Sequence, residues 1–171
     1  MKTRIIVDST ADLMPEFKNR VYTVPLTVNF GTEEYIDGVT IDHKTFYEKL
    51  IESDVLPTTS QAAPAAFEAV FAQVAERGNT AVVLTVAAGL SGTYQSAVIA
   101  AEDRDYVVSV DTKHVSVGQG VVVREVARVL EENPSMTVEE AAAAAERIRD
   151  ELKARGIEII DTPQGAKWRK V

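Results

Sequence analysis

A short loop of glycine and hydroxyl residues, Gly-Leu-Ser-Gly-Thr at residues 89–93, has the composition of a ligand-binding loop. Glycine lets the backbone approach a bound group closely, and Ser91 and Thr93 supply hydroxyl donors. A helix that begins directly after Gly92 would add free backbone N–H groups and the positive end of its dipole. We therefore predict a small-anion site here. The plainer interpretation, in which the hydroxyls only cap the helix and the glycines only make the turn, stays open.

A second hydroxyl cluster, Thr59-Ser60-Gln61, follows Pro57 and precedes another predicted helix. The two clusters together suit a single carboxylate, because hydroxyl groups can donate to both of its oxygens. Neither cluster contains lysine or arginine, and the chain has no P-loop pattern. A nucleoside triphosphate is therefore not expected as the ligand.

Two acidic residues, Asp8 and Asp111, each come at the end of a predicted strand. If the fold brought them together, they would suit acid–base chemistry or a magnesium ion, and the chain would be a small phosphotransfer or hydrolytic enzyme. The plainer interpretation is that both are turn and capping residues. Ser9 beside Asp8, and Gly118 and Gln119 in a Gly-Gln-Gly segment, are additional candidates for a pocket, although a flexible turn also explains that segment.

The chain contains no cysteine and only two histidines, His43 and His114. This excludes a disulfide framework, a thiol nucleophile, an iron–sulfur site and a histidine-rich metal site. A triad of Ser91, His114 and Asp111 is conceivable, but Ser91 lacks the Gly-x-Ser-x-Gly pattern, and we expect His114 to be an ordinary exposed residue. No catalytic residue, metal ligand or cofactor is therefore predicted.

The composition is that of a globular protein of 171 residues, with 46% hydrophobic and 26% charged residues. The net charge of −8 disfavours binding of nucleic acid. No apolar run approaches the roughly 18–20 residues that a membrane-spanning helix needs. The apolar run at residues 5–7 is also much shorter than the roughly 7–15 residues of a secretory signal, so a cytoplasmic protein is expected.

Strands and helices alternate in the hydrophobic pattern, which predicts an α/β fold with a parallel or mostly parallel sheet and helices on both faces. In such sheets ligands bind beyond the carboxyl ends of the strands, where the polar loops of this chain fall. The predicted strands are residues 5–7, 21–30, 81–86, 107–110 and 157–161. The predicted helices are residues 43–53, 64–78, 93–103, 119–132 and 137–155.

Short motifs in a fixed order along the chain resemble those of the DegV family, which comprises bacterial fatty-acid-binding proteins and includes the FakB subunits of fatty acid kinase. They are Asp-Ser-Thr-Ala-Asp-Leu at residues 8–13, Val-Pro-Leu at 24–26, Tyr-Ile-Asp-Gly-Val at 35–39, Thr-Ser-Gln at 59–61, Leu-Ser-Gly-Thr-Tyr-Gln-Ser-Ala at 90–97 and Ser-Val-Gly-Gln-Gly at 116–120.

The resemblance implies a carrier rather than an enzyme, with the fold of the DegV N-terminal lobe. In the family, hydroxyl groups hold the carboxyl group of a long-chain fatty acid, and a partner kinase phosphorylates the bound acyl group. By motif, the carboxylate would be held by Thr59, Ser60, Ser91, Gly92 and Thr93.

The resemblance, whose motifs span residues 8–120, implies that residues 1–162 form a domain like the family's N-terminal lobe and that residues 163–171 are a C-terminal tail with the second lobe absent. An exposed apolar face is then expected where that lobe would dock, covered by a partner or by a homo-oligomer. An alternative to the carrier is a single-lobe interaction or regulatory domain that has lost lipid binding. The other is the Asp-dependent phosphotransfer enzyme.

Overall fold

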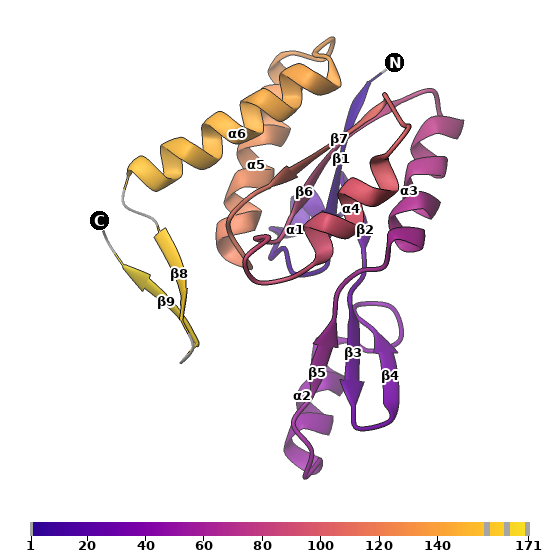
Figure 1. The fold of residues 1–171 in the computed structure, drawn as a ribbon, viewed down its shortest axis with the longest axis vertical. Helices are drawn as coiled ribbons and strands as arrows, with labels where there is room; N and C mark the ends of the chain where they lie inside the picture. The colour runs from indigo at the N-terminus through magenta and orange to yellow at the C-terminus, as the bar shows by residue number, and fades with distance from the viewer. Residues whose placement is uncertain (1, 156–157, 163–164, 170–171) are drawn as a thin grey trace.

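A parallel sheet in the order β2-β1-β6-β7 forms the centre of a computed structural model of the chain (Figure 1). The structure describes residues 2–155, 158–162 and 165–169. Each neighbouring pair of strands in this sheet is parallel, which confirms the predicted fold class. The strands are β1 (Thr3–Asp8), β2 (Tyr22–Val24), β6 (Thr80–Thr85) and β7 (Val107–Asp111).

The connections of the sheet run outward from its centre. The chain passes from β1 to β2 on one side and from β6 to β7 on the other. The carboxyl ends of β1 and β6 therefore form the topological switch point, where open α/β sheets commonly bind their ligands.

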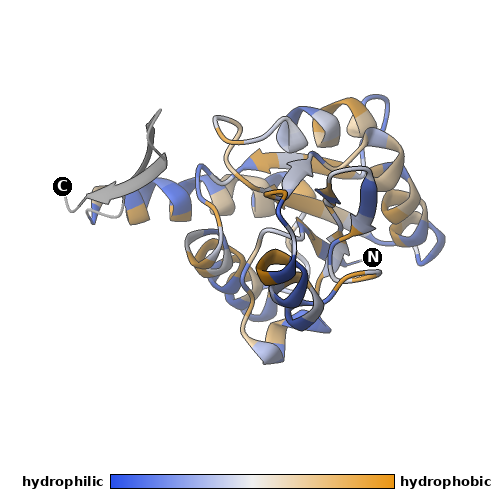
Figure 2. Ribbon diagram, turned by 90° about the horizontal axis from the view of Figure 1, so that it is seen from below, coloured by the Kyte–Doolittle hydropathy of each residue, from blue (hydrophilic) through white to orange (hydrophobic). Residues whose placement is uncertain are grey.

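The central strands are apolar on both faces because each face has its own core. Ile5 and Val82 enter one hydrophobic cluster, whereas their neighbours Ile6 and Val83 enter the other. Strands that are buried on both sides have continuous apolar sequences. This pattern is why these strands could be predicted from the sequence. Figure 2 shows hydrophobic colour along this sheet, whereas the helices carry both hydrophobic and hydrophilic residues.

Helices cover both faces of the sheet, as predicted (Figure 1). One face packs against α5 (Val117–Glu132) and α6 (Val138–Ala154), and the other against α3 (Pro64–Glu76) and α4 (Thr93–Ala101). A short helix, α1 (Pro15–Lys18), lies between β1 and β2. A capping box starts α6, in which the Glu140 backbone N–H donates to Thr137 Oγ1 and the Thr137 N–H donates to the Glu140 carboxylate.

A small antiparallel sheet of order β4-β3-β5 projects from the main body (Figure 1). It is made of β3 (Thr27–Phe30), β4 (Glu33–Ile36) and β5 (Thr58–Ser60), accompanied by α2 (His43–Glu52). Its core is a separate cluster of Val28, Phe30 and Ile41.

The prediction of one strand over residues 21–30 is wrong. β2 ends at Val24 in the parallel sheet, and β3 begins at Thr27 in the antiparallel sheet. Pro25 lies between them and has no N–H to donate to a ladder, so the chain changes sheets at this residue.

The last two strands pair only with each other among the described strands. β8 (Glu158–Thr162) and β9 (Gly165–Arg169) form an antiparallel two-stranded sheet. The predicted strand at residues 157–161 is thus present from residue 158, and residue 157 lies outside the described part. It does not extend the parallel sheet. The predicted division at residue 162 falls between the two strands and stays a prediction.

Candidate functional site

Two hydroxyl groups meet at the start of α4, directly after the loop at residues 89–93. The Oγ atom of Ser91 lies 2.9 Å from the Oγ1 atom of Thr93 and accepts a hydrogen bond from the Thr93 N–H at 3.2 Å. Thr93 is fully buried, whereas Ser91 and Gly92 are partly exposed. A polar group at this position faces the amino end of a nine-residue helix, where the dipole favours negative charge.

The segment after Ser60 is fastened to the same helix start. The Ala62 backbone N–H donates to Thr93 Oγ1 at 3.3 Å, and the Gln61 side-chain amide donates to Ser96 Oγ at 3.0 Å. Gln61 and Ala62 thus contact the start of α4 through Ser96 and Thr93. The structure therefore brings the end of the Thr-Ser-Gln segment to the loop at residues 89–93, about 30 positions later in the sequence, whereas the Thr59 and Ser60 hydroxyls form no hydrogen bond with Ser91 or Thr93 among the described residues.

Gly92 has a steric reason to be glycine. A Cβ atom added at this residue would lie 1.9 Å from Gln61 Oε1 and 2.8 Å from Gln61 Cδ. By contrast, a Cβ atom added at Gly89 meets nothing within 4 Å. The absence of a side chain at Gly92 therefore makes room for the Gln61 side chain. Gln61 and Ser96 were not predicted as site residues, although both lie within the motifs that carried the prediction.

Thr59 and Ser60 are exposed on β5, at the edge of the small antiparallel sheet. Ser60 Oγ accepts a hydrogen bond from the Asn29 side-chain amide at 3.3 Å. Successive side chains of a strand point to opposite faces, so Thr59 and Ser60 face different sides of this sheet. Their hydroxyls remain open to a ligand.

Asp8 occupies the topological switch point and is completely buried. One carboxylate oxygen accepts from the Thr10 N–H at 3.0 Å and from the Thr10 hydroxyl at 2.6 Å. The other accepts from the Val86 N–H at 2.6 Å and from the Gln119 amide at 3.2 Å. The carboxylate ties the ends of β1 and β6 together, so it acts as a structural acceptor rather than as a free acid or base.

The other residues named as pocket candidates are also engaged within the chain. Ser9 Oγ accepts from the Leu26 N–H at 3.0 Å, and buried Gln119 also donates to the Leu84 carbonyl at 3.1 Å. A Cβ atom at Gly118 would lie 2.9 Å from the His114 ring. A Cβ atom at Gly120 would lie 2.1 Å from the Asp12 carbonyl oxygen. The absence of a side chain at Gly120 therefore lets the backbone of Asp12 pack against it.

His114 is buried, with 4% of its surface exposed, so the expectation of an exposed residue is wrong. Its Nδ1 atom lies 2.5 Å from the Thr112 carbonyl oxygen, and its ring packs beside Gly118. Asp111 accepts instead from the Ala88 and Lys113 backbone N–H groups, at 3.1 and 2.9 Å. The conceivable triad with Ser91 is not formed, because each member has other partners.

Asp111 behaves as a turn acid, and Asp8 has no titratable neighbour that completes a metal site. The described residues contain no group of three or more histidine, aspartate or glutamate side chains placed to hold a metal ion. Within those residues no helix is both long and apolar enough to cross a membrane.

The architecture and the contacts of Ser91 and Thr93 define an α/β protein with neutral hydroxyl groups at the start of α4, after the carboxyl end of β6. The family described as "Uncharacterised protein, DegV family" matches residues 2–157. A DegV domain-containing protein of Clostridium perfringens is 34% identical over 157 residues, covering 90% of this chain and 56% of its own length. Another, from Caldanaerobacter subterraneus, is 33% identical and covers 94% of this chain and 57% of its own length. The chain belongs to the DegV family.

Solved structures of the family share the fold. "Fatty Acid Binding of a DegV family Protein from Thermus thermophilus" has a TM-score of 0.77 and 34% identity, covering 88% of this chain and 54% of that one. A stearic acid-binding protein from Eubacterium ventriosum has a TM-score of 0.74 and 30% identity, covering 84% and 52% of the two chains. The chain thus spans about half the length of the relatives that it matches.

Proposed function

We propose that this chain holds a long-chain fatty acid by its carboxylate and presents it to a fatty acid kinase partner. The observation that carries the proposal is the paired hydroxyls of Ser91 and Thr93, which lie 2.9 Å apart at the amino end of α4. Two solved relatives are described as binding a fatty acid, which is stearic acid in one of them. The proposed carboxylate ligands are Thr59, Ser60, Ser91, Gly92 and Thr93.

Uncharged hydrogen-bond donors are suited to holding a carboxylate that must later react. Hydroxyl and backbone N–H groups hold a carboxylate in place without the strong pairing that an arginine would give. No lysine or arginine lies in either hydroxyl segment. A carboxylate held in this way keeps an oxygen available as the acceptor in phosphoryl transfer, which the kinase partner would catalyse.

Affinity would come chiefly from the acyl chain. Each buried methylene contributes about 0.8 kcal/mol, so a chain of about 16 carbons outweighs the polar contacts. We propose that this chain supplies the carboxylate site as the lobe of residues 1–162. The wall around the acyl chain would be completed by further parts of a longer protein or by a second copy.

The first experiment is native mass spectrometry of the protein purified from cells, followed by lipid extraction. One fatty acid for each chain, or for each oligomer, would support the carrier. A clean protein mass with no lipid, also after incubation with stearic acid, would contradict lipid binding by this chain and favour the interaction or regulatory domain. Incubation with a kinase and ATP then tests the partner separately, because acyl phosphate should form only on the lipid-loaded protein.

A further inference from the structure

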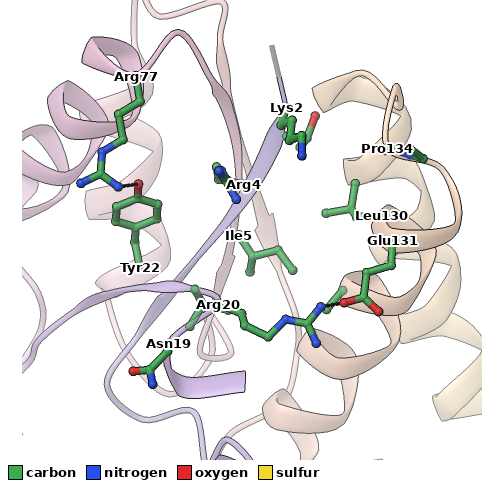
Figure 3. A pocket seen from close by; sticks show the side chains of 13 residues that line it. Lys2, Arg4, Ile5, Asn19, Arg20, Tyr22, Arg77, Leu130, Glu131 and Pro134 are labelled. Atoms are coloured by element: carbon green, nitrogen blue, oxygen red, sulfur yellow. Dashed lines mark hydrogen bonds and ion pairs between the residues drawn. The ribbon is translucent and has the colours of Figure 1, made fainter. Parts of the chain in front are cut away.

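A basic cavity lies at the amino end of the parallel sheet, opposite the candidate carboxylate site (Figure 3). Its volume is about 690 Å³. The walls come from the amino half of β1, the segment leading into β2, and the carboxyl ends of α3 and α5. Small-molecule sites in proteins occupy about 300–1,000 Å³, so this cavity has the size of one.

The cavity exists because the first two strands pair over only part of their length. β2 begins at Tyr22, which lies opposite Ile6, and the described register continues toward Asp8. The amino half of β1, from Thr3 to Ile5, therefore has no strand beside it on this edge among the described residues. The space that a longer β2 would fill is left open to solvent.

Positive charge is concentrated in this space although the whole chain carries a net charge of −8. The charged side chains that line it are Lys2, Arg4, Arg20, Arg77 and Glu131. Arg20 forms an ion pair with Glu131, and Arg77 donates to the Tyr22 hydroxyl at 3.1 Å. The described part of the chain offers no hydrogen-bond or ion-pair partner to the Arg4 guanidinium. Figure 3 shows Arg4 at the centre of the cavity, between Tyr22 and Leu130.

Helix ends explain only part of this charge. Arg77 stands at the carboxyl end of α3, where the helix dipole attracts a cation. Lys2 and Arg4 lie on or beside a strand, and the carboxyl end of α5 is the other helix end that lines the cavity. Four cations face one acid, Glu131, in this lining, and such an excess of like charge costs free energy unless an anion joins it.

We propose that this cavity binds a phosphate-bearing small molecule with at least two negative charges. Guanidinium groups present several N–H donors in a fixed plane and have no acceptor, so they match phosphate oxygens better than a lone carboxylate does. Arg4 would bind the phosphate from the floor of the cavity, and Arg77 would bind it from the side. Arg20 can exchange its Glu131 carboxylate for a phosphate oxygen. The inference does not depend on fatty acid binding.

The test uses sodium pyrophosphate as the probe and the full chain labelled with nitrogen-15. Amide resonances of Thr3–Ile5 and Asn19–Tyr22 are expected to shift in a saturable manner, whereas those at the start of α4 should not. Arg4→Gln and Arg77→Gln should each weaken binding about tenfold, the usual loss for one charge-assisted hydrogen bond. The matched control is Arg147→Gln, which removes the same charge from an exposed position on α6 and should leave the affinity unchanged.

Two results would overturn the proposal. One is an equal loss of affinity in all three variants, which would mean that only the overall charge matters. The other is citrate binding more tightly than pyrophosphate, which would assign the cavity to carboxylates. Because Arg4 is exposed and has no side-chain partner among the described residues, Arg4→Gln should fold normally, and its fatty acid content should equal that of the unmodified protein.

Discussion

The carboxylate of Asp8 accepts a hydrogen bond of 3.2 Å from the side-chain amide of Gln119, 111 positions later in the chain. The same carboxylate accepts the Val86 N–H at the end of β6. One acidic residue therefore joins the end of β1, the end of β6 and the first turn of α5. In many open α/β sheets this place is left to the ligand, whereas here the protein fills it with its own polar side chains.

Replacing Asp8 by alanine should lower the free energy of unfolding by about 3 kcal/mol, because the buried Val86 N–H and Gln119 amide lose their acceptor. Urea denaturation measures this loss. Asp54→Ala is the control, since Asp54 is exposed and should change stability by less than about 0.5 kcal/mol. Equal stability of the two variants would show that the network around Asp8 contributes nothing.

Ser91→Ala and Thr59→Ala should each weaken fatty acid binding by roughly 1–3 kcal/mol, the usual range for a lost hydrogen bond to a charged group. Displacement of a fluorescent fatty acid measures the affinity. Thr32→Ala is the control, because Thr32 is exposed in the turn between β3 and β4 and is not one of the proposed ligands. If Ser91→Ala and Thr59→Ala both kept the full lipid content, the proposed carboxylate site would be wrong.

Gly92→Ala should displace the Gln61 side chain, since the new Cβ atom would lie 1.9 Å from Gln61 Oε1. The Gln61–Ser96 hydrogen bond would then break, and the co-purifying lipid should decrease. Stability should change by less than about 1 kcal/mol, because alanine also restricts the unfolded chain. Gly89→Ala, whose Cβ atom meets open space, should keep the lipid. Lipid extraction of both variants separates a local effect in the site from a general effect of changing a loop glycine.

The small antiparallel sheet should become less stable in acid. The Asp42 carboxylate caps α2, and its hydrogen bond from the Thr45 backbone N–H holds the pKa of this carboxyl below its ordinary value. A carboxyl group whose pKa is lower in the folded state stabilises the fold above its unfolded pKa, about 3.9. This stabilisation is lost as the pH falls below that value toward the lower folded pKa. Asp42→Asn keeps a capping oxygen but does not titrate, so it should lose less stability between pH 5 and 3.

The amide exchange of α2 and the circular dichroism of the whole protein, measured between pH 5 and 3 for Asp42→Asn and for the unmodified protein, provide the comparison. An identical acid response of Asp42→Asn and the unmodified protein would show that the cap does not contribute to the pH dependence.

The buried strands could be predicted because their signal is local. Residues 81–86 form a continuous apolar run, and the structure places β6 at Thr80–Thr85. The family could also be predicted from local signals, because its motifs are short segments that occur in a fixed order along the chain. The division of residues 21–30 between two sheets could not be predicted, because the sheet to which a strand belongs depends on distant strands.

Long-range contacts account for the other errors. His114 is polar and lies in a loop, so local reasoning placed it at the surface, but Gly118 leaves room for its ring. The basic cavity was missed for a similar reason. Its cations, among them Lys2, Arg20 and Arg77, are scattered along an acidic sequence, and only the short β2 strand brings them around one space.

The position of Thr59 and Ser60 on the small antiparallel sheet has a consequence for ligand exchange. This sheet has its own minor core, whereas Ser91 and Thr93 lie at the start of α4, which packs on the parallel sheet. Regions with small cores open with a lower free energy than the body of a protein. The two halves of the proposed carboxylate site thus lie beside different hydrophobic cores, and the segment that joins them is tied to α4 at Gln61 and Ala62. If the small sheet opened first, the proposed site would loosen its hold on a ligand at Thr59 and Ser60 while the start of α4 stayed folded.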